Sequence, residues 1–223
     1  MTDARRLKGY RVEVPVRAGR GEVWKAVTQP AVLRRWFGWD YEGLEAEIRQ
    51  IFVNQAALLE GDRMGWADGS YLEVTGDVDN STVCAIREGP AADTDRFDAI
   101  EEGWKAFLVQ LRFLLEHRPK GSRRTVYLTG AATGRETLAL VDAAWERAGS
   151  RVAWAVVPEG HLVVAAGHVP LSRRSTAAMQ ITVSTYGLPD EEFALCRDDW
   201  AKRWTSVATG AQVTVAGSPD PTG

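Results

Sequence analysis

The sequence contains few of the residues that build metal and redox sites. It has two cysteines, Cys84 and Cys196, and three histidines among 223 residues. Two cysteines so far apart form neither a disulfide framework nor a zinc-binding pattern, and we expect both to act as small core residues. His117, His161 and His168 have no carboxylate or cysteine at ligand spacing, and we interpret them as structural or solvated. The sequence therefore predicts no metal and no cofactor.

Motifs of common enzyme families are also missing. The chain has no GxSxG, HExxH or CxxC motif, and GAATGRE at 130–136 lacks the GK[ST] ending of a phosphate-binding loop. No side chain is nominated as a nucleophile or a general base. We therefore predict no catalytic residue, and the interpretation leans away from an enzyme.

The chain also lacks long apolar runs and an excess of basic charge. No stretch of 18 apolar residues occurs, which argues against a membrane span. The first ten residues have arginines but no apolar run after them, so we expect no secretory signal and a cytoplasmic protein. The formal charge of −3 argues against a nucleic-acid partner. What the chain does have is 45% hydrophobic residues, enough for a sizeable core.

The first half of the chain shows alternating strand and helix patterns. Apolar residues at every second position predict a strand over 9–17. Helical spacing follows in RGEVWKAVTQ, and Pro30 is placed to begin a second short helix, AVLRRWF. From 44 to 88 we predict a meander of strands divided by Gly-, Asp- and Asn-rich turns: LEAEIRQIFV, AALLEGDRMGW, SYLEVTGD and STVCAIRE.

A long amphipathic helix and a repeated pattern follow. The helix is predicted over 101–116, with the apolar stripe Trp104, Phe107, Leu108, Leu111, Leu114 and Leu115. After a linker at 117–124, the order strand, glycine turn and helix returns at 126–141. Three more strands are predicted in RVAWAVV, HLVVAAG and STAAMQITVSTYG. A closing helix is predicted over 189–210, with the stripe Phe193, Cys196, Trp200, Trp204 and Val207.

Residues 9–117 resemble the bacterial Aha1-like branch (activator of Hsp90 ATPase homologue) of the START/Bet v 1 helix-grip proteins, the SRPBCC superfamily. The resemblance rests on four stretches: VWKAVTQPAVLRRWFG, DGSYLEV, STVCAIREG and EEGWKAFLVQL. Residues 125–208 look like a shortened second copy without the LxxWFG element. The resemblance implies an α+β fold in which a curved antiparallel sheet wraps around a long C-terminal helix. Family members hold hydrophobic small molecules in the apolar space between the two.

The resemblance and the repeat together predict the domain organisation. We expect an Aha1-like helix-grip domain over 1–120, a shortened helix-grip-like copy over 122–210 and a disordered tail over 211–223. Each half should form a sheet that is covered by its own C-terminal helix. Trp104 and Trp200, at matching places in the two apolar stripes, should both be buried.

The stretch AVLRRWFGWDYEG at 31–43 concentrates aromatic residues in one short segment. Such a cluster can complete the core, line a ligand cavity or form an exposed docking patch. In a helix-grip arrangement the segment closes one end of the grip. The candidate ligand-binding residues from the whole chain are Trp36, Phe37, Trp39, Trp66, Tyr71, Trp104 and Phe107.

Three functions remain open from the sequence. The first is a non-enzymatic protein that holds a small hydrophobic molecule between sheet and long helix. The second is a co-chaperone-like module with a protein partner, and the third is a cyclase- or hydrolase-like enzyme. Neither a nucleic acid nor a membrane is expected as a partner.

Overall fold

The first half of the chain forms a five-stranded antiparallel sheet. The computed structural model describes residues 8–89 and 96–218. The strands of this sheet lie in the order β1-β5-β4-β3-β2, and their bounds are β1 Tyr10–Val16, β2 Ala57–Leu59, β3 Arg63–Gly65, β4 Ser70–Gly76 and β5 Ser81–Arg87. In β1, buried and exposed residues alternate along the whole strand, as the period-two pattern predicts. The strand predicted over 9–17 is confirmed.

Helices, not a strand, lie between the first two strands of the sheet. Their bounds are α1 Arg20–Thr28, α2 Pro30–Leu33, α3 Leu44–Arg49 and the π-helix η1 Gln50–Asn54. The strand predicted in LEAEIRQIFV is therefore wrong. Leu44, Ile48 and Phe52 recur at a spacing of four residues and are all buried, which is a helical period. The residues predicted as a strand at AALLEGDRMGW form the hairpin β2–β3, where Gly61 and Asp62 have positive φ.

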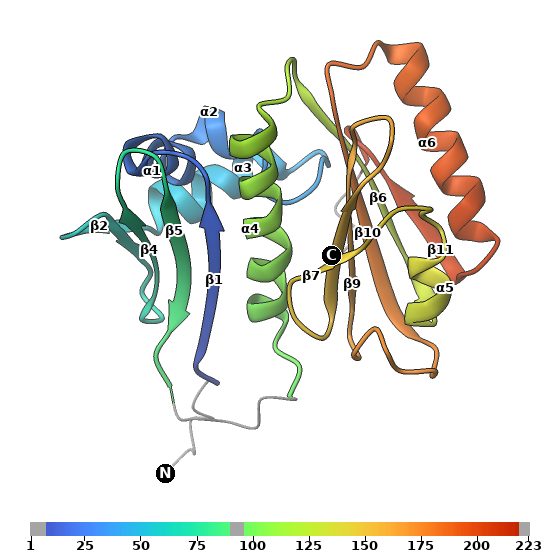
Figure 1. The fold of residues 1–223 in the computed structure, drawn as a ribbon, viewed down its shortest axis with the longest axis horizontal. Helices are drawn as coiled ribbons and strands as arrows, with labels where there is room; N and C mark the ends of the chain where they lie inside the picture. Colours follow the sequence, from blue (N-terminus) through green and yellow to red (C-terminus); the bar gives the residue numbers. More distant parts are fainter. Residues whose placement is uncertain (1–7, 90–95, 219–223) are drawn as a thin grey trace.

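The long helix α4, Ala99–His117, lies between the two halves of the molecule (Figure 1). Its N-cap is Asp98, whose carboxylate accepts hydrogen bonds from the backbone N–H groups of Ile100 and Glu101 at 3.0 and 3.1 Å. One face of α4 packs against the first sheet, and the other face packs against the second. The predicted amphipathic helix is confirmed, but it has two apolar faces instead of one.

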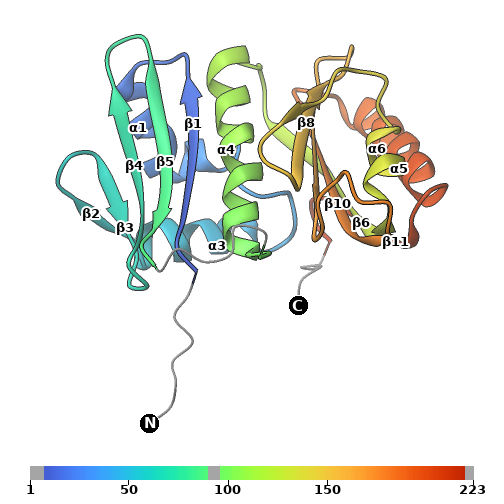
Figure 2. The same ribbon diagram turned by 60° about the horizontal axis from the view of Figure 1, so that its bottom comes forward.

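The second half forms a six-stranded antiparallel sheet in the order β11-β6-β10-β9-β8-β7. Its elements are β6 Arg123–Ala132, α5 Gly134–Leu138, β7 Glu146–Arg147, β8 Val152–Val156, β9 Leu162–Gly167, β10 Ala177–Tyr186, α6 Asp190–Thr205 and β11 Thr209–Thr214. Helices α5 and α6 cover the face opposite α4 (Figures 1 and 2). Every residue of β9 is buried for this reason, since helices lie on both faces of its sheet.

The C-terminal end differs from the prediction in two places. Helix α6 ends at Thr205, not at residue 210, and residues 209–214 form the edge strand β11, which pairs with β6. A disordered tail beginning at residue 211 is therefore wrong for 211–218, while 219–223 lie outside the described residues. The segment TGAQVTV ends in three consecutive β-branched residues, a strand signal that follows the helix closely. Trp104 and Trp200 are both buried, as predicted.

The two halves share one order of connections. In each, a first strand pairs with the last strand of the meander, and a long helix follows that last strand: β1, β5 and α4 in one half, and β6, β10 and α6 in the other. In each half, a glycine just before the first strand lies against a glycine just after the last strand of the meander. A Cβ on Gly9 would lie 2.9 Å from the backbone N of Gly89, and a Cβ on Gly121 would lie 2.5 Å from the Cα of Gly187. These matches support our proposal of two tandem copies, over 1–120 and 122–210.

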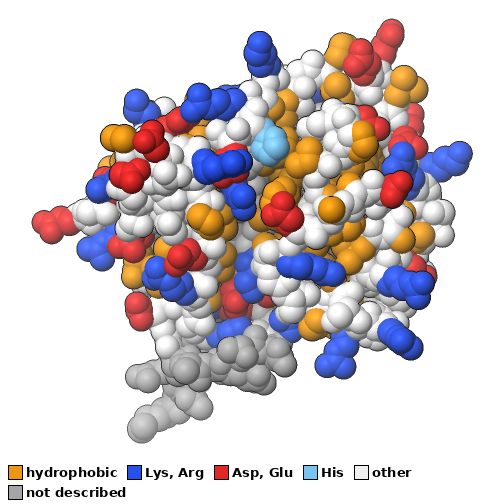
Figure 3. All heavy atoms as spheres, viewed as in Figure 1, with side chains coloured by type: hydrophobic (Ala, Val, Ile, Leu, Met, Phe, Trp, Pro, Cys, Tyr) orange, Lys and Arg blue, Asp and Glu red, His pale blue; other side chains and the backbone are white. Residues whose placement is uncertain are grey.

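The surface carries charges of both signs. On the face shown in Figure 3, acidic and basic side chains are interspersed, and hydrophobic side chains gather in the middle over α4 and the second sheet. Of the helices in residues 8–89 and 96–218, none combines the length and the apolar character that crossing a bilayer requires.

Candidate functional site

A cavity of about 710 Å³ lies beside the N-terminal half of α4. Its wall is shared by both halves of the chain: the loop after α2, helix η1 and the β3–β4 turn from the first half, and β6, β9 and β10 from the second. The aromatic lining residues are Phe37, Trp39, Trp66, Phe97, Trp104, Phe107 and Tyr127. The polar or charged ones are Glu47, Gln55, Asp68, Ser70, Glu102, Gln110, His168, Gln180 and Thr182.

Five of the seven residues that the sequence nominated for ligand binding line this cavity. They are Phe37, Trp39, Trp66, Trp104 and Phe107. Trp36 is instead fully buried in the core, where its indole N–H donates a hydrogen bond to the carbonyl oxygen of Ala26 at 2.9 Å. Tyr71 is not part of the lining, and its ring lies under the guanidinium of Arg63. Ligand binding by the five lining residues stays a prediction.

The aromatic segment at 36–39 joins the two halves of the molecule. Trp36 and Phe37 are buried, so the exposed docking patch is wrong for both. Gly38 has a φ of 59°, a left-handed conformation that favours glycine and redirects the chain after Phe37. The loop then passes α4 and reaches the second sheet (Figure 1). This turn places Phe37 and Trp39 in the same cavity wall.

Asp40 fixes the end of this loop to β6. The backbone N–H of Asp40 donates to Oγ1 of Thr125 at 2.6 Å, and the Asp40 carboxylate accepts from the backbone N–H of Thr125 at 2.8 Å. Its other oxygen accepts from the Arg34 guanidinium at 2.6 Å. Asp40 is 2% exposed, so the two bonds to its carboxylate replace the hydration that this group loses on burial.

The buried Arg123 holds the same loop from the other side. Its guanidinium donates to the carbonyl oxygens of Phe37 at 2.9 Å and Gly38 at 2.7 Å, and it also bonds the side chains of Gln110 and Ser184. Desolvation by burial lowers the pKa of Arg123 below its usual value. Because neutral oxygens satisfy its donors, we assign Arg123 a positioning role.

Rings from different elements contact one another along the cavity wall. The Phe37 ring centroid lies 4.7 Å from that of Phe107 on α4, and Trp66 lies 6.0 Å from Trp104. On the opposite side Trp39 stacks on Tyr127 of β6. Tilted, edge-to-face and stacked pairs at these distances each contribute beyond the area they bury. Such contacts hold the aromatic wall in place.

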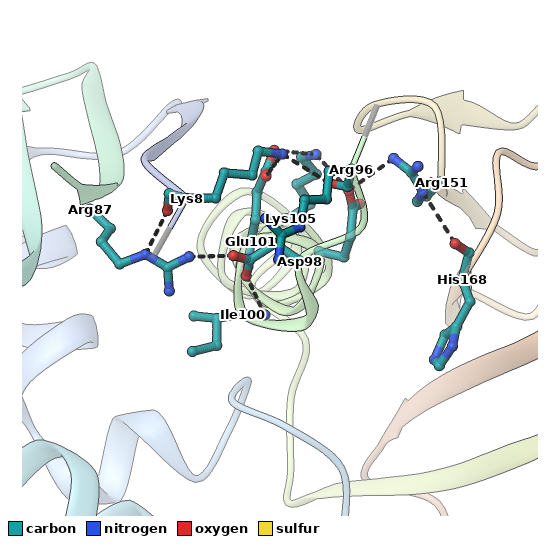
Figure 4. Close-up of polar contacts among 10 residues, drawn as sticks. Lys8, Arg87, Arg96, Asp98, Ile100, Glu101, Lys105, Arg151 and His168 are labelled. Atoms are coloured by element: carbon teal, nitrogen blue, oxygen red, sulfur yellow. Dashed lines mark hydrogen bonds and ion pairs between the residues drawn. The ribbon is translucent and has the colours of Figure 1, made fainter. Parts of the chain in front are cut away.

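A charged cluster surrounds the first turns of α4 (Figure 4). Lys8 and Arg87 approach from the side of the first sheet, and Arg151 approaches from the second, where its guanidinium donates to the backbone carbonyl oxygen of His168. Lys8 and Lys105 contact the Glu101 carboxylate at 2.7 and 2.8 Å. Desolvation acts to raise the pKa of Glu101, but the hydrogen bonds from Lys105 and Lys8 outweigh it, and the pKa is lowered.

Glu102 belongs to both the cluster and the cavity wall. It is 5% exposed, and its Oε1 atom lies 2.9 Å from the Lys105 ammonium and 3.8 Å from the Arg151 guanidinium. Desolvation acts to lower the pKa of Lys105, but the two glutamates beside it outweigh this and raise the pKa. The result is a paired, buried carboxylate in the wall of the cavity.

Sequence reasoning missed the lining residues that come from the second half. Tyr127, Gln180 and Thr182 lie on strands whose periodicity predicts burial but not which element covers them. His168 also lines the cavity and stacks on Phe97, with ring centroids 4.5 Å apart. No sequence pattern indicates any of these residues, since the wall forms only when the two halves meet at α4.

No group of three or more His, Cys, Asp or Glu side chains in the described ranges is placed to hold a metal ion. The cavity lining combines aromatic faces with the carboxylates of Glu47, Asp68 and Glu102, the imidazole of His168 and several neutral polar groups. Such a lining can enclose an apolar molecule and orient it by hydrogen bonds.

Comparisons with known proteins place this chain in no family. No family model matches the sequence, and no curated protein matches it. Two solved structures are similar at a TM-score of 0.33 each: DynU16, a protein of the dynemicin biosynthetic locus, at 18% identity, and BexL, a di-domain ARO/CYC of the BE-7585A biosynthetic pathway, at 12%. Each alignment covers 89% of this chain and 96% of the other. Likeness at this level assigns neither a family nor an activity, and the Aha1-like branch finds no support in the comparisons.

Proposed function

We propose that this protein binds a small, largely apolar molecule in the cavity beside α4. The observation that carries the proposal is a space of about 710 Å³ walled by Phe37, Trp39, Trp66, Trp104 and Phe107. Ligand sites in proteins commonly measure roughly 300–1,000 Å³ and combine apolar lining with a few polar groups. The size and the composition of this cavity both fit that description.

The proposed site differs in one respect from the site predicted from the sequence. A ligand space was expected between the first sheet and the long helix, within one copy. The cavity is closed on one side by β6, β9 and β10 of the second half. We therefore propose that both halves contribute to binding. Neither half expressed alone should then bind the ligand.

The proposal can be tested by titrating an apolar fluorescent dye into two variants. Phe37→Ala enlarges the cavity, while Phe113→Ala removes an equally buried phenylalanine of α4 that packs outside it. Both changes should cost about 3–5 kcal/mol of stability. We expect only Phe37→Ala to change the dye's dissociation constant by several fold.

Two further measurements complete this test. Phe37→Leu, a smaller change, serves if the alanine variant does not fold. Native mass spectrometry of the purified wild type should show a co-purified apolar molecule or binding of the added dye. Dye binding that is equal in wild type, Phe37→Ala and Phe113→Ala, or absent from all three, would overturn the proposal.

A cyclase- or hydrolase-like enzyme is the second candidate. The observation that favours it is the presence of titratable groups, Glu102, Asp68 and His168, in the same wall. Incubation of the protein with its captured molecule, followed by mass spectrometry over time, separates the two. A change in the molecule's mass or chromatographic retention that depends on Glu102 or His168 supports the enzyme, and an unchanged molecule supports binding alone. A filled interior would favour the co-chaperone-like module, and the cavity of about 710 Å³ favours a small-molecule ligand instead.

A further inference from the structure

Two buried polar atoms in the cavity wall have no hydrogen-bond partner. In residues 8–89 and 96–218 the buried side-chain nitrogens and oxygens without one are Nε1 of Trp39, Oε2 of Glu102 and Nε of Arg112. Arg112 lies outside the cavity and forms an ion pair with Glu116 at 3.3 Å. Trp39 and Glu102 both line the cavity. Leaving such atoms unpaired costs about 1–3 kcal/mol each, so their coincidence in one wall calls for an explanation.

Four other indoles have the backbone acceptor that Trp39 lacks. The N–H groups of Trp36 and Trp66 donate to the carbonyl oxygens of Ala26 and Ile51, both at 2.9 Å. Trp145 and Trp204 likewise have backbone acceptors. The ring of Trp39 is held by stacking on Tyr127, yet its N–H meets no acceptor. A residue of the cavity lining therefore carries a donor that the fold leaves without an acceptor.

Glu102 presents the complementary case. Its Oε1 atom is occupied by Lys105 and faces Arg151, while Oε2 has no donor. The side chain is 6% exposed, so bulk water does not reach it freely. Its position on α4 is fixed by those two cations, which come from α4 itself and from the second half. One wall thus carries a fixed acceptor at Glu102 and a fixed donor at Trp39.

We propose that the bound molecule carries two polar groups on an apolar body: a hydrogen-bond donor that meets Oε2 of Glu102, and an acceptor that meets Nε1 of Trp39. This inference rests on the proposed function. A hydroxyl or N–H group suits Glu102, and a carbonyl or ether oxygen suits Trp39. An anionic group beside Glu102 is disfavoured, because it would meet the like charge of a buried carboxylate. The ligand class is therefore a neutral molecule with a phenol- or alcohol-like group and a carbonyl-like group.

A matched set of probes tests the two contacts separately. Pyrene has no polar group, hydroxypyrene adds a donor, and acetylpyrene adds only an acceptor. Against wild type, we expect hydroxypyrene to bind about tenfold tighter than pyrene, because hydrogen bonds to charged groups are the stronger ones. Acetylpyrene should bind about threefold tighter than pyrene, through the neutral indole N–H.

Two conservative variants should remove these preferences one at a time. Glu102→Gln keeps the shape but turns the free oxygen into an amide N–H once the amide oxygen faces Lys105, so the preference for hydroxypyrene should fall to roughly threefold or less. Trp39→Phe keeps a ring on Tyr127 and should abolish only the preference for acetylpyrene. Tyr71→Phe, outside the cavity, is the control and should change neither ratio. Thermal unfolding of each variant confirms that it folds.

The outcomes separate this inference from the proposed function. If all three probes bind wild type equally, or if the ratios persist in both variants, the two-point recognition is wrong while the apolar site stands. If no probe binds wild type, the proposed function fails with it. If each variant lowers only its own ratio, both conclusions are supported.

Discussion

The indole of Trp39 stacks on the phenol ring of Tyr127, with centroids 4.0 Å apart and ring planes 4° from parallel. One ring comes from the loop after α2 and the other from β6, so the pair joins the two halves of the chain. Both rings line the cavity. The wall of the candidate site is therefore also part of the interface between the halves, and what stabilises the interface also shapes the site.

Loss of Arg123 should weaken this interface. Arg123→Met leaves the carbonyl oxygens of Phe37 and Gly38 without their donor in a buried place. We expect a loss of about 2–5 kcal/mol in the free energy of unfolding, measured by urea denaturation. The control Arg197→Met removes an arginine that pairs at the surface with Asp198, and it should change stability by less than about 1 kcal/mol. Equal effects in the two variants would contradict the positioning role.

Truncation of Trp104 tests the helix face that carries the cavity. Its indole is 9% exposed and contacts Trp66 and Phe107. Trp104→Ala should cost about 3–5 kcal/mol, seen as a lower denaturant midpoint with an unchanged slope. The exposed Ile100, one turn earlier on α4, is the control, since Ile100→Ala should shift the midpoint little. A midpoint that hardly moves for Trp104→Ala would mean that this face does not pack as described.

The charged cluster on α4 predicts a pH dependence. The pKa of Glu101 is lowered in the folded protein from its usual 4.5, because bonds from Lys105 and Lys8 outweigh desolvation. Its stabilising contribution is therefore complete above pH 4.5 and is lost as the pH falls through the lower, folded value. We expect the stability of the wild type to fall more steeply below pH 4.5 than that of Glu101→Gln. Parallel curves for the two proteins, measured by urea denaturation at several pH values, would refute this assignment.

Parts of the fold could be predicted from local patterns, and α4 is the clearest example. Its Trp104, Phe107 and Leu111 spacing predicts a helix, and the helix is there. The segment around Leu44, Ile48 and Phe52 is ambiguous by the same criterion, because a short segment with mixed residues matches a helix and a strand almost equally well. The structure resolves the ambiguity, because it places all three side chains in the core on one face of α3 and η1.

The candidate site was less predictable than the fold. Aromatic content pointed to Phe37 and Trp39, since few other segments concentrate so many rings. Glu102 lies in a helix that is acidic in its first turn, where a carboxylate is ordinarily a response to the helix dipole. Nothing in the sequence shows that β9 and β10 would close the cavity over it. Contacts across the two halves depend on how the halves dock, which periodicity does not encode.

The two cysteines should be unreactive in the folded protein. Desolvation by burial is the largest of the causes that raise the pKa of Cys84 to about 11. Desolvation also raises the pKa of Cys196. Because the thiolate is the nucleophile, both should react with iodoacetamide at neutral pH far more slowly than a free thiol. Mass spectrometry of the native and the urea-unfolded protein measures this directly. Rapid modification of Cys84 in the native state would show that its strand is not packed as described.

The glycine pair Gly121–Gly187 should tolerate no side chain. A Cβ on Gly121 would lie 2.5 Å from the Cα of Gly187, and Gly121 also has a φ of 84°. Gly160 has a closely similar φ of 81°, but a Cβ there would meet nothing within 4 Å. Alanine at either position would therefore pay the same penalty for a left-handed backbone conformation, but only alanine at Gly121 would also clash with the backbone of Gly187.

Comparing alanine at these two glycines isolates the collision. Gly160→Ala should cost about 1–2 kcal/mol, from placing alanine in a left-handed conformation. Gly121→Ala should cost at least about 1–3 kcal/mol more, because the backbone at Gly187 has to move. Urea denaturation of both variants at one pH measures the difference. Equal losses would mean that the strands next to these glycines are not in close contact, and they would remove one of the matches between the two proposed copies.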